Sequence, residues 1–170
     1  MTIAEQVVAN AKSYLGKREK KANSGFEDPE FESEMKEEGW QKGWAWCCVF
    51  AKVVYKNVIP TKAKEFDKLF SPSCVQTFKN FENAKYNIHA LPRPGYLVLY
   101  QSIKEGKPQP TGHAAIVTEL ISTWEFKSID GNSNDEGGRE GIEVSFQPHK
   151  KVLKDVWNGM KVLGFIQPWD

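Results

Sequence analysis

The sequence predicts an α+β fold in which amino-terminal helices pack on an antiparallel β-sheet. Two observations lead to this prediction. Up to Phe81 the apolar residues recur mostly at helical spacing, whereas from Gly95 onward they form the short alternating or continuous stretches typical of strands. Helices that precede strands, instead of alternating with them, favour antiparallel pairing. A chain of 170 residues can bury a core of its own, so we expect a single domain over residues 1–170.

Helical spacing is found in five stretches of the first half. Gly16 is placed to end the first of them, and Asp28 followed by Pro29 supplies a capping side chain and a first-turn proline for the second. The third is the central helix, which ends before Pro60. The expected helices cover residues 3–15, 29–38, 46–57, 63–70 and 74–81.

The second half is predicted to be strands joined by polar, glycine- and proline-rich loops. The expected strands cover residues 96–100, 113–121, 124–129, 142–146 and 162–166. The expected loops or variable connections cover residues 87–94, 104–112, 131–141 and 150–160.

The composition excludes several classes of function. A formal net charge of +1, with 40% hydrophobic and 26% charged residues, is ordinary for a globular protein and creates no field that would attract nucleic acid. No apolar run approaches the roughly 18 residues of a membrane span. The first 16 residues are amphipathic and charged and lack a secretory pattern, so we expect synthesis in the cytoplasm without a signal peptide. We expect neither a nucleic-acid partner nor insertion into a membrane.

The three cysteines do not form a disulfide framework. Cys47 and Cys48 are adjacent, and Cys74 lies in a separate segment, where it is expected to pack as a small apolar group. A zinc site is not predicted either, because no second Cys/His pair has ligand spacing. The cysteine count therefore favours free thiols.

The residues that carry chemistry begin at Cys47, which opens the central helix. A thiol in the first helical turn lies where the helix dipole favours an anion, which lowers its pKa and makes it a nucleophile. The alternative is an inert core cysteine. His113 stands at the start of an apolar strand, and Asp130 and Asn132 stand at the end of the next one. If these two strands pair across a short turn, a thiol, an imidazole and an orienting polar group meet.

These motifs resemble a known family. Trp-Cys at 46–47, Gly-His followed by small and apolar residues at 112–113, and Asp-Gly-Asn at 130–132 are similar in order to the CHAP domain, a cysteine- and histidine-dependent amidohydrolase/peptidase. CHAP domains are papain-like peptidoglycan hydrolases related to the NlpC/P60 enzymes. The likeness covers most of the chain and implies that Cys47 is the nucleophile and His113 the base.

The resemblance leaves the third catalytic residue open between two positions. Asp130 stands where the family usually has a glutamate, and Asn132 matches the polar residue two positions further on. We expect Asp130 to orient and charge-stabilise the imidazole and Asn132 to make a secondary contact. Cys48 departs from the family, in which a small residue is usual.

Other residues near the motif are expected to support the reaction. The Cys47 backbone N–H and the side chain of Gln41 are candidates for binding the oxyanion. Trp44 and Trp46 are candidates for contacting substrate, because aromatic faces often line carbohydrate and peptide clefts, although core packing explains tryptophans equally well. The acidic stretch 27–38 could hold calcium, but a solvated helix face explains it better, and no metal or other cofactor is predicted.

The resemblance implies a hydrolase that cleaves an amide bond of bacterial peptidoglycan. Without a signal peptide, such an enzyme is expected to be a phage lysin or an injected antibacterial effector that acts on the cell wall or in the periplasm. It is expected to be a monomer, with an immunity protein as a partner if it is an effector. Two alternatives are a papain-like amidase acting on a small amide or a protein, and an inactive binding module on the same fold.

Overall fold

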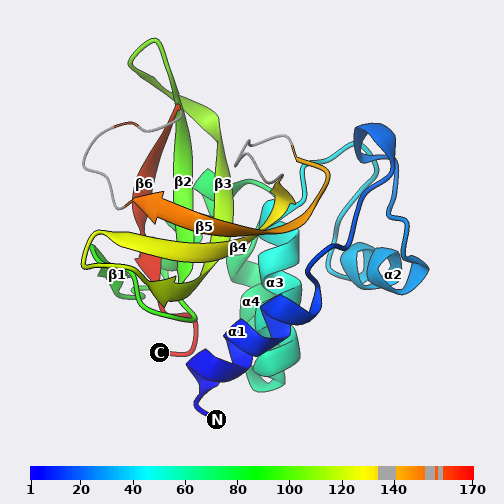
Figure 1. Ribbon diagram of the computed structural model, residues 1–170, viewed down its shortest axis with the longest axis horizontal. Helices are drawn as coiled ribbons and strands as arrows, with labels where there is room; N and C mark the ends of the chain where they lie inside the picture. Colours follow the sequence, from blue (N-terminus) through cyan, green and yellow to red (C-terminus); the bar gives the residue numbers. More distant parts are fainter. Residues whose placement is uncertain (134–140, 152–155, 157–158) are drawn as a thin grey trace.

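Helices and sheet occupy opposite sides of the structure (Figure 1). The computed structural model describes residues 1–133, 141–151, 156 and 159–170. In the view of Figure 1, strands β4 (Glu125–Ser133) and β5 (Glu143–Lys151) run across the other long strands, so the sheet is strongly twisted. The predicted α+β class with an antiparallel sheet is confirmed.

Side-chain caps begin three of the helices, and Asp28 is the cap that the sequence predicts. Thr2 forms a capping box with Glu5, and the Asp28 carboxylate accepts hydrogen bonds from two backbone N–H groups of the next turn at 2.9 and 3.0 Å. Ser73 caps the last helix in the same way. The helices are α1 (Ile3–Ser13), α2 (Pro29–Glu37), α3 (Cys47–Val58), α4 (Ala63–Leu69) and α5 (Cys74–Asn83), with short 3-10 turns η1 (Lys21–Asn23) and η2 (Pro60–Lys62). None of the helices in the described part of the chain has the length and apolarity to cross a bilayer.

The strands form one antiparallel sheet in the order β1-β6-β2-β3-β4-β5. The remaining strands are β1 (Ile88–His89), β2 (Leu97–Lys104), β3 (Lys107–Leu120) and β6 (Met160–Ile166). The predicted loops at 131–141 and 150–160 lie partly outside the described residues, and their described ends were wrong, because residues 131–133 belong to β4 and residues 150–151 to β5.

Two predicted loops were partly wrong. The segment 104–112 is the tip of a hairpin, because Glu105 and Gly106 both have positive φ (50° and 73°) and make a two-residue turn between β2 and β3. The segment 87–94 contains β1, whose His89 pairs with Phe165 and is half-buried. Both differences arise because strand pairing satisfies backbone groups in segments whose side chains are polar.

Helix α3 is the centre of the hydrophobic core and holds the site in place. Every residue from Cys47 to Tyr55 is buried, and the helix packs on α1, α2, β3 and β4. Gly131 of β4 lies against the Phe50 ring, since a Cβ at this position would be 2.8 Å from the Phe50 side chain. This close approach brings the end of β4 to the amino end of α3.

Candidate active site

Cys47 is the first residue of α3 and has 4% of its surface exposed. The preceding residue, Trp46, anchors the start of the helix. Its indole N–H donates a 2.8 Å hydrogen bond to the Glu19 carboxylate, and its ring packs edge-on against Phe26 and Phe50. The thiol is therefore held at the positive end of the helix dipole, where a thiolate is favoured.

His113 and Asp130 form a buried hydrogen-bonded pair. Asp130 pairs with Ala115 across β3 and β4, so its side chain lies on the same face as that of His113, two residues before Ala115. His113 Nε2 lies 2.8 Å from Asp130 Oδ2. His113 Nδ1 is buried and has no hydrogen-bond partner of good geometry among the described residues, and it is left to interact with the nearby Cys47 thiol.

Two further side chains hold Asp130, which is fully buried. The Ser128 hydroxyl donates to Oδ1 at 2.5 Å, and Lys150 Nζ of β5 lies 3.4 Å from Oδ2. Burial by itself raises the pKa of Asp130, but the Lys150 charge and the hydrogen bonds from His113 and Ser128 hold that pKa below its usual value. The carboxylate therefore stays ionised inside the protein.

The pKa values of the thiol and the imidazole move in opposite directions. Hydrogen bonds from Cys48 and Cys74, together with the charge of His113, hold the pKa of Cys47 well below its usual value despite burial. Burial lowers the pKa of His113, but Asp130 and Cys47 outweigh it and raise that pKa to about 9. At neutral pH the favoured state is a thiolate beside an imidazolium.

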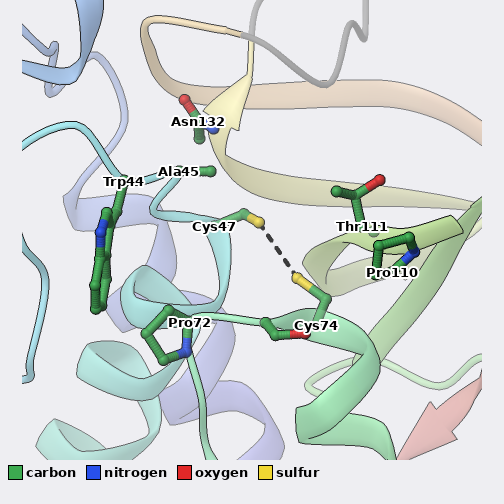
Figure 2. Close-up of a pocket in the computed structure, with 10 residues that line it drawn as sticks. Trp44, Ala45, Cys47, Pro72, Cys74, Pro110, Thr111 and Asn132 are labelled. Atoms are coloured by element: carbon green, nitrogen blue, oxygen red, sulfur yellow. Dashed lines mark hydrogen bonds between the residues drawn. The ribbon is translucent and has the colours of Figure 1, made fainter.

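A cavity of about 300 Å³ opens onto the Cys47 thiol (Figure 2). Its lining is largely uncharged and comes from the segment before α3, the start of α5, the β3 strand and the end of β4. The lining residues are Trp44, Ala45, Cys47, Pro72, Ser73, Cys74, Pro110, Thr111, Gly112 and Asn132. The Cys47 thiol is therefore part of the lining of this cavity, beside the Cys74 thiol.

The structure brings together some of the predicted site residues. Cys47, His113 and Asp130 meet, and Trp44, 41% exposed, lies at the cavity. Asn132 lines the cavity in a left-handed backbone conformation (φ 54°), and its Oδ1 is buried without a hydrogen-bond partner in the described part of the chain. Asn132 and Cys47 line the same cavity (Figure 2), and among the described residues His113 hydrogen-bonds Asp130 and not Asn132.

Two predicted supporting residues lie elsewhere. Trp46 has no exposed surface, so the expectation that it contacts substrate was wrong, and its ring serves the core and its N–H the Glu19 contact. Gln41 is exposed and does not line the cavity. The side chain of Gln41 is therefore not brought to the nucleophile.

Sequence reasoning missed two residues of the site. Lys150 was assigned to a variable connection, but β5 continues through it and places its ammonium beside Asp130. Cys74 was expected to pack as a small apolar group; it is buried as expected, but its Sγ also lies 3.5 Å from that of Cys47 and 2.8 Å from that of Cys48. The alternation at 142–146 is interrupted by Pro148, so it did not indicate that the strand reaches Lys150, and no pattern in the sequence indicates the approach of Cys74.

The described residues contain no cluster of three or more His, Cys, Asp or Glu side chains arranged to hold a metal ion. The acidic stretch 27–38 forms part of α2 and its cap, where Asp28 and Glu32 pair with lysines.

Comparison of the chain with protein-family models, with curated proteins and with solved structures found no match.

Proposed function

We propose that this chain is a cysteine amidohydrolase with a papain-like, CHAP-type fold that cleaves an amide bond of bacterial peptidoglycan. The observation that carries the proposal is the alignment of Cys47, His113 and Asp130 at the base of a cavity, with the thiol at a helix amino end. The resemblance of the three sequence motifs to CHAP domains supplies the substrate class.

The proposed reaction follows from the pairing of these groups. The Cys47 thiolate attacks the carbonyl carbon of the amide, and the carbonyl oxygen becomes an oxyanion. The Cys47 backbone N–H is among the helix N–H groups without an intrahelical partner, so it is free to donate to that oxygen. The amide of Asn132, which lines the same cavity, is a second group near enough to contact it.

The proton transfers run through one nitrogen of His113. Because Nε2–H is directed at Asp130, Nδ1 is the atom that exchanges protons on the Cys47 side. Nδ1–H protonates the leaving amine as the C–N bond breaks, which leaves a thioester on Cys47. Nδ1 then accepts a proton from a water molecule that attacks the thioester and releases the acid. Asp130 holds the ring in this tautomer throughout.

The cavity is compatible with a neutral acyl group next to the scissile bond. Pro72, Pro110 and Gly112 present little polarity, and the half-exposed ring of Trp44 offers a flat face for a sugar or an extended peptide. In this proposal the enzyme reaches the cell wall by release from a lysed host or by injection, and an immunity protein, where one exists, blocks this cavity.

The test is digestion of purified sacculi by the reduced protein, followed by mass spectrometry of the released fragments. We expect new amine and carboxylate ends at one type of amide bond, and no such ends with Cys47→Ala as the matched control. Intact sacculi with the wild-type protein would contradict the peptidoglycan substrate.

A thiol probe then separates the two alternatives. An amidase with another substrate would still have a Cys47 that iodoacetamide alkylates faster at pH 6 than an ordinary thiol. An inactive binding module would bind sacculi in a pelleting assay and lack this reactivity.

A further inference from the structure

Three buried free thiols meet beneath the cavity. Cys74, the first residue of α5, lies between the other two sulfurs, at 3.5 Å from Cys47 Sγ and 2.8 Å from Cys48 Sγ. Catalysis as proposed above uses only Cys47 as a nucleophile, and the other two thiols contribute hydrogen bonds that lower its pKa. Small apolar residues would fill the same space without the risk of oxidation.

The three thiols differ in access and in reactivity. Cys47 and Cys74 both line the cavity and point toward one another in Figure 2, whereas Cys48 does not line it. Cys48 is buried, which raises its pKa, and hydrogen bonds to Cys47 and Cys48 raise the pKa of Cys74. An oxidant that enters the cavity therefore meets one thiolate, Cys47, with a protonated thiol directly beside it.

We propose that Cys47 and Cys74 form a reversible oxidation site, in which Cys74 is the resolving thiol for Cys47 oxidised by a hydroperoxide. The inference rests on the proposed function only in taking Cys47 as the reactive thiol. Its consequence is an enzyme that oxidation switches off and a thiol reductant switches on again.

The chemistry needs one equivalent of hydroperoxide. The Cys47 thiolate attacks the terminal oxygen, the O–O bond breaks, and the leaving oxygen takes a proton to become water or an alcohol. The Cys74 sulfur then attacks the Cys47 sulfenic acid, the S–O bond breaks, and the hydroxide leaves as water with the Cys74 proton. Two thiols lose two electrons in total, and the hydroperoxide gains them.

The geometry favours this partner. Two sulfurs 3.5 Å apart need to approach by about 1.5 Å to reach the roughly 2.05 Å of a disulfide bond. Cys74 begins α5 after the non-helical segment 71–73, so it is carried by a different element from Cys47 and approaches it from across the cavity. Cys48 also hydrogen-bonds Cys47 but is its direct neighbour in α3, where Cα atoms about 3.8 Å apart are closer than the roughly 4.4–6.8 Å that a disulfide needs.

The experiment treats the reduced full-length chain with a small excess of hydrogen peroxide and maps its peptides without reduction. Trypsin leaves Cys47 and Cys48 together in the peptide 43–52 and Cys74 in the peptide 69–79. In the Cys48→Ser variant, a link between the two peptides can form only through Cys47. We expect this link, the loss of two thiols and recovery of both with dithiothreitol.

The matched variant is Cys74→Ser, checked for folding by circular dichroism, with Cys74→Ala as a second version. We expect it to lose one thiol, to form no link and to accumulate Cys47 sulfinic acid that dithiothreitol does not reduce. Two results would overturn the proposal. One is Cys47 sulfinic acid in the Cys48→Ser protein, and the other is a link between the two peptides that forms in the wild-type protein but not in Cys48→Ser. The peptide mapping uses no substrate, so it tests this proposal even if the protein does not digest sacculi.

Discussion

Replacing Asp130 by asparagine tests the electrostatic design of the site most directly. The change keeps the shape of the side chain and removes a charge that is fully buried and 2.8 Å from His113 Nε2. A hydrogen bond to a charged group contributes about 1.5–3 kcal/mol, and one pKa unit corresponds to about 1.4 kcal/mol. We therefore expect the pKa of His113 to fall by about one to two units from its value of about 9.

The sign of the effect on activity follows from the ion pair. The active state needs protonated His113, so the alkaline limb of the pH–rate profile lies at the pKa of His113 and moves down when that pKa falls. The assay is the initial rate of sacculus digestion at low substrate across pH, with circular dichroism to confirm that the variant folds despite leaving Lys150 without its carboxylate. An unshifted limb and wild-type turnover in Asp130→Asn would refute the assignment of Asp130 and move the orienting role to Asn132.

Two matched variants separate Asp130 from its neighbours. Asn132→Ala should lower the rate less than Asp130→Asn and leave the alkaline limb in place, because Asn132 makes no hydrogen bond to His113 within the described residues. Lys150→Met removes the cation that lowers the pKa of Asp130, so that pKa rises and activity is lost at a higher pH on the acid side. A downward shift of the alkaline limb in either variant would contradict the assignment of the alkaline limb to His113 and of the acid limb to Asp130.

Three further outcomes are expected. Cys47→Ala should abolish amide cleavage with the fold intact. Cys48→Ala should keep most of it, since Cys48 does not line the cavity, but the Cys47 pKa should rise because a hydrogen bond that lowers it is lost. A reversed result in the sacculus assay would show that the nucleophile was misassigned. His149→Asn should keep at least half of the activity, because His149 pairs at 3.1 Å with Glu125 and contacts none of the three proposed catalytic residues. Loss of activity in this variant, with activity retained in His113→Asn, would contradict the triad. EDTA in a thiol-reducing buffer should leave the rate unchanged, because thiolate, imidazole and carboxylate supply nucleophile, acid–base and orienting group; complete loss that calcium or zinc restores would contradict this.

The sequence predicts the helices and the pairing of His113 with Asp130 for local reasons. Asp28 and Pro29 act within one turn of the helix that they start, so their effect is visible in the sequence. The short turn between β3 and β4 places Asp130 opposite Ala115 and leaves little choice of partner for the His113 imidazole.

The residues that sequence reasoning misplaced depend on packing between distant elements. The position of Trp46 directly before Cys47 does not tell whether its ring faces the cavity or the core. Its contacts with Phe26 and Glu19, which are distant in the sequence, place the ring in the core. Lys150 is a charged residue that reads as a strand end, yet its ammonium reaches a buried carboxylate through a long apolar stem. The contact of Cys74 with Cys47 follows from the docking of α5, for which the sequence has no local pattern.

The burial of the proposed catalytic residues and the exposure of the cavity's edge, its rim, have a consequence for protein engineering. The proposed triad is buried on α3, β3 and β4, whereas Trp44 and Pro72 at the cavity are exposed and lie outside the helices and strands. A library that randomises only these rim positions changes which acyl groups fit and leaves the buried scaffold untouched. Selection for a new bond preference can therefore proceed without a loss of folding yield, in contrast to libraries that include Phe50 or Gly131, which a single added carbon atom would disrupt.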